Sequence, residues 1–512
     1  MTHHNILPIP KPVHDDTKCY TSRRNFTAHG EKEFPMTRLL FRQRLVQTAA
    51  ACLLLASPLG QAESLLDIYE LALNNDAQLK AQEAQYLANL QQERLALSAL
   101  LPQVTAGYGI SGVVNESTSQ QILGFDPTGT PVIGEGFNRS DTDTDGWDVS
   151  LSQTLFDLSA WYNYQAGEEV SKRAEAEFAA NTQNLIVRTV EAYFAVLRAQ
   201  DNLAAAEAQE RAFERQLEQT RQRFEVGLIA ITDVYEAEAA RDLAQVGRIV
   251  EENNVAVAKE RLSVLTGQEH GELFKLSDDF QAKPPAPADR SEWVNFALNN
   301  NYQLAAARYA EEAARQSAKA NRYEHAPKVS ATYRYEDTET QGTRSAIPEP
   351  IFLVQPDSEQ TREVWQVRVD MPLFTGGRLS ANRRRAEQEY IAAKENRVNL
   401  MRTTVTSARS LHMTVLSDVA RVAARRQSIK SSQSALDATE AGYEVGTRNI
   451  VDVLNAQNLV FQSERDYANS RYDFIVNSLR LKENAGTLSP DDVKRLDAFL
   501  NPPPAPTASE NQ

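Results

Sequence analysis

The most suggestive chemistry in the sequence lies at Asp141, Asp143 and Asp145, which precede Gly146 in the run DTDTDG. Aspartates at alternate positions followed by glycine are typical of the start of a calcium-binding loop, whose carboxylate oxygens coordinate the ion. Such a loop also needs a bidentate glutamate at its twelfth position, and here that position is Ser152. We therefore expect this run to form a solvated loop that attracts cations weakly, and not a calcium site.

The other residues that commonly do chemistry are scattered. After residue 62 the histidines are His270, His325 and His412, which are far apart and show no metal-ligand spacing. The sequence contains no G-x-S-x-G motif and no phosphate-binding or dinucleotide-binding glycine pattern. We therefore expect no catalytic residue, no cofactor and no metal, and we expect that the chain is not an enzyme.

The start of the chain has the features of a secretory signal. Residues 36–62 combine a basic beginning, a short apolar core and small residues before a cleavage position. We expect cleavage between Ala62 and Glu63, and we interpret residues 1–35 as an upstream extension. The alternative is a leader with a role of its own.

Charge and cysteine usage exclude several classes of protein. The formal net charge of −15 disfavours a nucleic-acid-binding surface. Cys19 and Cys52 both precede the expected cleavage position, so the mature chain would have neither a disulfide nor a thiolate metal site. No later segment has about 18 consecutive apolar residues, so a membrane span would have to be built from strands.

The sequence contains an internal duplication. Residues 71–79 (LALNNDAQL) match residues 296–304 (FALNNNYQL), and FEVGLIAITDV at 224–234 matches YEVGTRNIVDV at 443–453. Because these matches keep their order and nearly one spacing, they predict two structural repeats. We place the first repeat at 63–281, a proline-rich linker at 282–295, the second repeat at 296–490, and a C-terminal segment with a disordered tail at 491–512.

Each repeat predicts the same elements. Apolar and polar residues alternate around Trp147 and Trp365, which predicts strand pairs within 102–156 and 327–374, each strand about ten residues long. Two proline-free runs then follow, at 160–226 and 378–445, and predict very long helices. Gly227 and Gly446 come directly after these runs and predict hairpin turns, at which each helix turns back on a partner.

Four strands with one apolar face cannot close a barrel within one chain. An open sheet would leave unpaired backbone groups in lipid, and bacterial single-chain barrels begin at about eight strands. We therefore expect several chains to share a barrel, with Trp147 and Trp365 at corresponding strand ends in the aromatic belt of the membrane interface. The alternative is the edge of a soluble β-sandwich beside a coiled coil, but the sequence offers no evident second sheet.

The order of these elements resembles the TolC-like outer-membrane efflux and secretion channels, which are members of the outer membrane efflux protein family. The resemblance covers essentially all of 63–490, and its most specific stretches are RFEVGLIAITDV at 223–234 and GYEVGTRNIVDVLNAQ at 442–457. It implies an α+β membrane protein: a homotrimer with a twelve-stranded outer-membrane β-barrel, four strands from each chain, continued by an α-helical coiled-coil tunnel across the periplasm. A mixed band near the middle of the tunnel would come from residues 268–295 and the C-terminal residues.

The resemblance also implies a function and partners. The protein would be the exit duct of a tripartite efflux pump or type I secretion system, working with a periplasmic adaptor and an inner-membrane pump of the RND, ABC or MFS type. It would sit in outer-membrane lipid and bind no nucleic acid. A non-transporting coiled-coil envelope scaffold is the alternative, although a scaffold needs no strands with one apolar and one polar face. The sequence leaves open whether the cargo is a drug or a secreted protein.

The same resemblance implies a gate at the hairpin turns. By residue-for-residue match, Tyr443 and Arg448 look like polar ties that hold the inner hairpin shut against neighbouring groups such as Thr232 and Asp233. The alternative is that Tyr443 is a core aromatic residue and Arg448 a solvated turn residue.

Asp452 is the residue we expect at the narrowest point. It follows the second turn, where a carboxylate also complements the helix dipole. In a trimer, three copies of Asp452 would form a ring that concentrates cations. Relatives commonly have a second aspartate three residues later, where this chain has Asn455. We therefore expect one charged ring in place of two, and weak block by cations.

Overall fold

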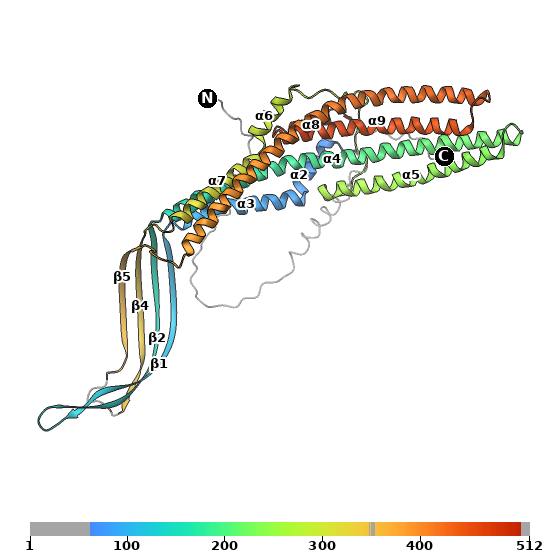
Figure 1. Ribbon diagram of the computed structural model, residues 1–512. Helices are drawn as coiled ribbons and strands as arrows, with labels where there is room; N and C mark the ends of the chain where they lie inside the picture. Colours follow the sequence, from blue (N-terminus) through green and yellow to red (C-terminus); the bar gives the residue numbers. More distant parts are fainter. Residues whose placement is uncertain (1–61, 348, 350–353, 503–512) are drawn as a thin grey trace, which may run out of the picture. The chain divides into compact units, whose positions relative to one another are not determined.

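The computed structural model describes residues 62–347, 349 and 354–502 (Figure 1). The expected signal, except Ala62, and the tail from residue 503 lie outside the described residues. The elements are α2 (Leu65–Asn75), α3 (Ala77–Ser98), β1 (Gln103–Phe125), β2 (Pro131–Phe156), α4 (Leu158–Glu225), α5 (Ile231–Thr266), β3 (Lys275–Leu276), α6 (Arg290–Asn300), α7 (Tyr302–Tyr323), β4 (Lys328–Ile347), β5 (Ser358–Asp370), α8 (Arg378–Glu444), α9 (Ile450–Asn484), α10 (Pro490–Asp497) and β6 (Leu500–Asn501).

The order of elements occurs twice along the chain. The series α2, α3, β1, β2, α4, α5 is followed by α6, α7, β4, β5, α8, α9. Capping side chains fix where several of these elements begin. The Asp157 carboxylate accepts hydrogen bonds from the backbone N–H groups of Ser159 and Ala160, at 2.9 and 3.1 Å. These bonds satisfy donors that the first turn of a helix leaves free, so the chain changes from strand to helix at Asp157.

Two helices are far longer than the rest. Helix α4 has 68 residues and α8 has 67, so each is about 100 Å long at 1.5 Å per residue. Helix α4 packs against α3, α5 and α7, and α8 packs against α7 and α9. These lateral contacts provide most of the stability of such helices, because helix propensity alone contributes little. None of the helices in the described part of the chain combines the length and apolarity that crossing a bilayer requires.

The main hydrophobic core lies where helices from both halves of the chain meet. Its largest fully buried side chains include Tyr193 and Phe194 of α4, Leu65 of α2 and Ile475 of α9. Strand β3 pairs with β6 beside this core, which brings the segment after α5 next to the C-terminal residues. The Tyr193 hydroxyl donates a hydrogen bond to the carbonyl oxygen of Phe274 at 2.8 Å, so the buried phenol is satisfied.

The remaining strands form one antiparallel sheet in the order β1-β2-β4-β5. Val149 of β2 lies opposite Ala106 of β1 and Tyr335 of β4. Because side chains alternate across a strand, residues in register share a face, and this face carries the apolar residues. The sheet therefore has one apolar and one polar side over this part of its length.

The expected strand length of about ten residues is wrong. Strands β1, β2, β4 and β5 contain 23, 26, 20 and 13 residues. The apolar alternation marks only the part of each strand near the helices. Beyond it the backbone ladder continues through polar pairs such as Thr142 with Gly342, because ladder hydrogen bonds need no apolar side chains.

The expectation of a loop at DTDTDG is also wrong. Asp141, Asp143 and Asp145 lie inside β2, opposite residues of both β1 and β4. Aspartate is disfavoured in strands, but here it alternates with threonine, and that period of two is the pattern of a strand. The turn between β1 and β2 lies instead at Asp126, whose carboxylate accepts hydrogen bonds from the N–H groups of Thr128 and Thr130.

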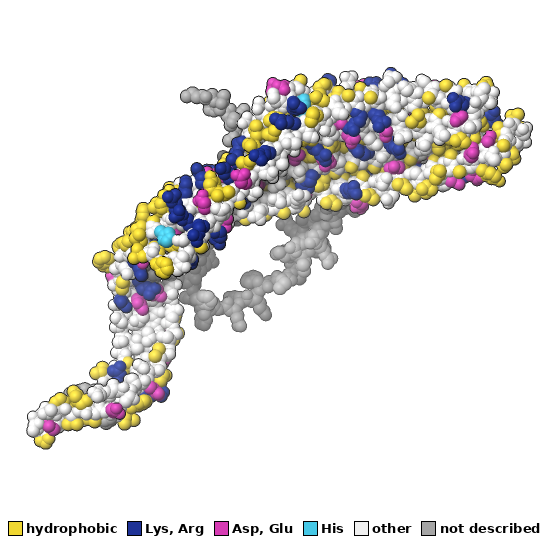
Figure 2. All heavy atoms as spheres, viewed as in Figure 1, with side chains coloured by type: hydrophobic (Ala, Val, Ile, Leu, Met, Phe, Trp, Pro, Cys, Tyr) yellow, Lys and Arg dark blue, Asp and Glu magenta, His cyan; other side chains and the backbone are white. Residues whose placement is uncertain are grey.

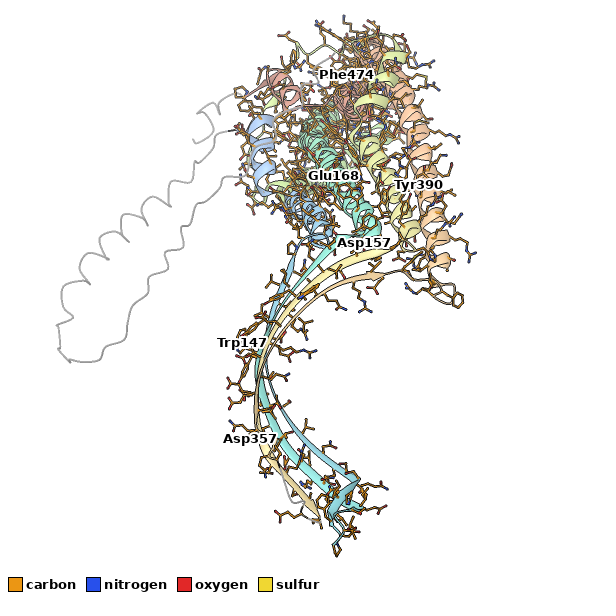
Figure 3. The ribbon with its side chains drawn as sticks, turned by 90° about the vertical axis from the view of Figure 1, so that its left-hand side faces the viewer. Trp147, Asp157, Glu168, Asp357, Tyr390 and Phe474 are labelled. Atoms are coloured by element: carbon orange, nitrogen blue, oxygen red, sulfur yellow. The ribbon has the colours of Figure 1, made fainter. Side chains whose placement is uncertain are left out.

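The two tryptophans do not lie at corresponding strand ends. Trp147 is in the interior of β2 (Figure 3), between Tyr108 of β1 and Asp337 of β4. Its ring lies 5.0 Å from that of Tyr335. Trp365 of β5 pairs with Tyr333, and Tyr333 pairs with Leu151 of β2. The two indoles are therefore four residues apart along the ladder, because matching the two repeats in sequence does not fix the register between their strands.

Candidate functional site

The first hairpin turn joins α4 to α5 at Gly227. The N–H of Gly227 donates to the Phe224 carbonyl at 2.8 Å, and the N–H of Leu228 donates to the Arg223 carbonyl at 2.9 Å. These bonds form a Schellman motif, which satisfies carbonyls at the end of α4. Helix α5 then begins after Ala230, which provides no side-chain cap.

The second turn joins α8 to α9 at Gly446 with the same motif. The N–H of Gly446 donates to the Tyr443 carbonyl at 3.1 Å, and the N–H of Thr447 donates to the Gly442 carbonyl at 2.8 Å. Here the returning helix is capped, because the Asn449 side chain accepts from the N–H of Asp452 at 2.8 Å. The second turn therefore has a side-chain cap that the first turn lacks.

Backbone conformation, and not space, requires glycine at both turns. Gly227 has a φ of +78° and Gly446 a φ of +79°, and an added Cβ at either position would meet no atom within 4 Å. A residue with a side chain in this left-handed region costs roughly 1–2 kcal/mol. The sharp reversal of each long helix depends on that freedom.

Arg448 and Asp452 form an ion pair within the second turn. An Arg448 guanidinium nitrogen lies 3.7 Å from an Asp452 carboxylate oxygen, and the two residues are one helical turn apart. Both side chains are more than one third exposed, so the pair contributes about 0.2–1 kcal/mol. Asp452 lies on the first turn of α9, and Asn455 is exposed on the next turn.

Tyr443 connects the two hairpins. The guanidinium carbon of Arg223, near the end of α4, lies 4.6 Å from the centre of the Tyr443 ring. The ring also packs on a small core that includes Phe213, Ala244 and Ile450. The Tyr443 hydroxyl is buried and has no hydrogen-bond partner among the described residues. Tyr443 thus contacts the first hairpin through its ring, and not through its hydroxyl.

The structure does not bring the expected tie together within one chain. Thr232 is exposed, and its hydroxyl lies 3.4 Å from the carboxylate of Asp233. In the part of the chain that the structure describes, neither residue forms a hydrogen bond or ion pair with Tyr443 or Arg448. The arginine that reaches Tyr443 is Arg223, which the sequence reading missed. The available signal was its position directly before the aromatic residue of the first Gly turn.

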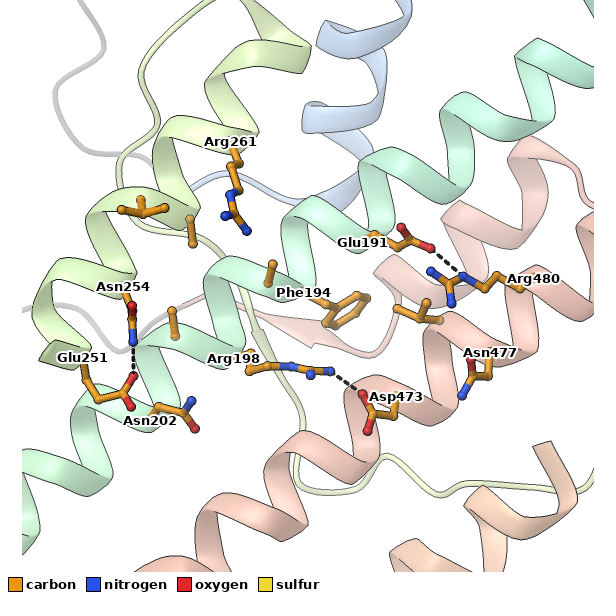
Figure 4. A pocket seen from close by; sticks show the side chains of 15 residues that line it. Glu191, Phe194, Arg198, Asn202, Glu251, Asn254, Arg261, Asp473, Asn477 and Arg480 are labelled. Atoms are coloured by element: carbon orange, nitrogen blue, oxygen red, sulfur yellow. Dashed lines mark hydrogen bonds and ion pairs between the residues drawn. The ribbon is translucent and has the colours of Figure 1, made fainter. Parts of the chain in front are cut away.

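A polar pocket of about 500 Å³ lies between α4, α5 and α9 (Figure 4). Arg198 pairs with Asp473 at 2.5 Å across it, and Arg480 pairs with Glu191 at 2.8 Å. Arg261 projects into the same space from α5 (Figure 4). Its lining contains neither a nucleophile paired with a base nor a metal-ligand set, and no group of three or more metal-ligand side chains occurs within the described ranges.

A partly buried polar pair lies beside the main core. The Tyr472 hydroxyl of α9 donates to the Asp201 carboxylate of α4 at 2.5 Å. Burial raises the pKa of Asp201 above its ordinary value, against the opposing effects of this hydrogen bond and of nearby Lys275 and Arg471. Burial likewise raises the pKa of Tyr472. The pair joins the two long hairpins and has the character of a structural contact.

Known proteins resemble the chain over most of its length. The family described as outer membrane efflux protein matches residues 68–268 and 293–487. The outer membrane protein TolC of Vibrio cholerae is 34% identical over 443 residues, which cover 86% of this chain and 94% of TolC. The alkaline protease secretion protein AprF of Pseudomonas aeruginosa is 28% identical over 462 residues, which cover 90% of this chain and 92% of AprF.

Solved structures share the fold. The outer membrane protein VceC of Vibrio cholerae matches with a TM-score of 0.61 and 18% identity, over 82% of this chain and 96% of VceC. TolC and VceC are named as outer membrane proteins and AprF as a secretion protein, and together with the family match they confirm the expected resemblance. The chain therefore belongs to the outer membrane efflux protein family, and its place is the outer membrane.

Proposed function

We propose that three copies of this chain form an exit duct that passively conducts substrates from an inner-membrane transporter across the periplasm and the outer membrane. The open sheet is the observation that carries this proposal. Strands β1 and β5 are its edges, and its apolar face is exposed in the single chain, with Trp365, Val367 and Val369 exposed by 81%, 58% and 64%. Such a face and such edges need partners.

The requirements of lipid favour a shared barrel. In a bilayer every backbone N–H and C=O group must be paired within the protein, so the edges of the sheet must join the edges of other copies. Two copies would supply eight strands, whose interior is filled by side chains. Three copies would supply twelve, an even number within the bacterial range and wide enough for an aqueous channel.

The long hairpins α4–α5 and α8–α9 of three copies would continue this barrel as a coiled-coil tunnel. On this proposal the repeats at 63–281 and 296–490 each supply one strand pair and one hairpin, joined by the linker at 282–295. Gly227 and Gly446 then lie at the periplasmic mouth, where six hairpin turns form the gate.

The gate would use contacts between neighbouring copies. Within one chain Arg448 pairs with Asp452 and Tyr443 stacks on Arg223. The proposed ties from Tyr443 and Arg448 to Thr232 and Asp233 would therefore be made between copies. Three Asp452 side chains would form a ring that attracts cations. Because Asn455 carries no charge, the next helical turn would not add a second charged ring.

The partners we propose are a periplasmic adaptor and an inner-membrane pump of the RND, ABC or MFS type, together with outer-membrane lipid. The family match and AprF support this proposal at the level of the system, because the family is described as outer membrane efflux protein and AprF is named for protease secretion. A duct that serves a pump needs no catalytic residue of its own.

Native mass spectrometry in mild detergent and conductance in planar bilayers test the proposal together. We expect a trimer, and discrete single-channel currents from the purified protein. Monomers or dimers would contradict the shared barrel. A stable trimer that conducts no ions would favour the non-transporting scaffold.

A further inference from the structure

We infer that the junction between the sheet and helix α8 binds the anionic headgroups of phospholipids in the periplasmic leaflet of the membrane. The inference rests on the proposed function, because it takes the apolar face of the sheet to lie in lipid. It goes beyond that function by naming a lipid class and the side chains that select it.

Exposed apolar side chains continue to the very end of the sheet. Trp365, Val367 and Val369 alternate along β5, and Leu373 follows three residues after Asp370, the last strand residue. Leu373 is 85% exposed and the adjacent Phe374 is 86% exposed. Figure 2 shows hydrophobic side chains covering the region where the helices meet the sheet. The apolar surface thus ends within a few residues of the start of α8.

Arginines follow directly on the first two turns of α8. Leu379 and Ala386 are buried and mark the packed side of these turns. At about 100° per residue, Arg378, Arg384 and Arg385 fall on the sides away from this packed side, and all three are exposed. Lys and Arg side chains gather over the adjoining part of the helices in Figure 2.

The reach of these side chains places their charges beside the apolar surface. Arg384 and Arg385 lie about 9–10 Å along the axis from the start of α8. Side chains on a helix lean toward its N-terminus, and arginine can extend its stem along apolar surface while its charge stays in a polar layer. The guanidinium groups therefore fall near the level of Leu373 and Arg378, where a headgroup layer would begin.

The cluster has few anionic partners of its own. Arg385 lies 3.5 Å from Glu389, and both are largely exposed, so the pair is weak. Arg378 and Arg384 form no ion pair with any described residue. This positive cluster stands out in a chain whose net charge is −15. Apolar residues followed by exposed arginines, two of them without an ion pair among the described residues, are complementary to acyl chains followed by phosphate groups.

The test compares two charge-matched variants in nanodiscs made from an equal mixture of zwitterionic phosphatidylethanolamine and anionic phosphatidylglycerol. The first is Arg378→Gln with Arg384→Gln and Arg385→Gln. The control, Arg402→Gln with Arg409→Gln and Arg426→Gln, removes three exposed arginines from later turns of the same helix. Native mass spectrometry gives the ratio of anionic to zwitterionic lipid retained by the protein.

We expect the junction variant to lower this ratio several-fold, because each basic residue near an anionic surface favours binding by about fivefold. The control and Arg385→Lys should keep the ratio of the parent. An unchanged ratio in the junction variant, or an equal fall in the control, would overturn the inference. Loss of binding to isolated peptidoglycan with an unchanged lipid ratio would overturn it too, and would assign the arginines to that polymer.

Conductance of the same preparations separates this inference from the proposed function. If the parent conducts and the lipid ratio does not respond to the junction variant, only the lipid inference fails. If the parent neither inserts nor conducts, the proposed function fails and the lipid inference fails with it.

Discussion

The contact between Arg223 and Tyr443 should hold the two hairpins of each chain together at their turns. It joins α4 to α8 with a guanidinium-to-ring distance of 4.6 Å, and both residues are half-buried. Arg223→Met keeps most of the apolar stem and removes the charge. The variant should therefore lose the cation–π attraction with little loss of packing.

The size of the effect follows from the setting of the contact. Cation–π pairs contribute about 0.5–1 kcal/mol when exposed and about 2 kcal/mol when desolvated. For a half-buried pair we take about 1 kcal/mol, which corresponds to about a fivefold change in an equilibrium constant. Hydrogen exchange of the amides at 442–448 reports local opening of the second turn, so it should become about fivefold faster in Arg223→Met.

Two controls make this prediction specific. Arg221→Met removes the same charge two residues earlier, where Arg221 pairs with Glu238 at 3.4 Å within the first hairpin. This variant should leave exchange at 442–448 nearly unchanged. Tyr443→Phe keeps the ring face and removes a hydroxyl that has no partner among the described residues, so it should also change exchange little. Equal rates in Arg223→Met and the parent, or equal acceleration by Arg221→Met, would refute the reasoning.

Four further predictions concern the gate, the sheet and the core. Tyr443→Phe combined with Arg448→Ser should raise single-channel conductance, because charge-assisted hydrogen bonds from arginine contribute about 1.5–3 kcal/mol when shielded. Unchanged conductance would mean that Tyr443 is a core aromatic residue and Arg448 a solvated turn residue. Asp452→Asn should abolish block of the channel by cations from the periplasmic side, and Asn455→Asp should tighten block by multivalent cations. If cation block survives in Asp452→Asn, the Asp452 carboxylate only stabilises its helix. Val149→Asp or Val367→Asp should each lower the free energy of unfolding in lipid by roughly 1–3 kcal/mol, measured by denaturant titration, since aspartate in the lipid-facing band costs less than arginine or lysine; no change would place these residues outside lipid. Asp201→Asn should alter the pH dependence of the melting temperature. The pKa of Asp201 in the folded state lies above its ordinary value of 3.8, so the parent loses stability as the pH rises through the raised pKa. The melting temperature of the variant relative to the parent should thus increase from about pH 3 to about pH 7, and a difference that is constant with pH would contradict this.

Local sequence patterns were sufficient to predict the two longest helices, the hairpin turns and the family. The proline-free runs coincide with α4 and α8, and the two Gly-centred motifs coincide with the helix reversals. These features are local: a residue such as Gly227 is needed because of its own φ, whatever its neighbours are. The same motifs carried the resemblance that the comparisons confirmed.

Strand length and register were not predictable in this way. The apolar alternation covers only part of each strand, and the backbone ladder carries Asp141, Asp143 and Asp145 well beyond it. Pairing is decided by the facing strand, so a polar stretch that looks like a loop becomes strand when a partner continues beside it. For the same reason the offset of four residues between Trp147 and Trp365 follows from the register of the strands and not from the sequence match between the repeats.

At the candidate gate the sequence determined the residue types, and the tertiary structure decided which of them meet. Tyr443 and Arg448 were identified by their match to the family and Asp452 by its position after the second turn, but their partners come from packing. Arg223 reaches Tyr443 only because α4 and α8 end side by side, 220 residues apart in the chain. A contact of that kind depends on how whole hairpins pack against each other, and no local pattern in the sequence contains that information.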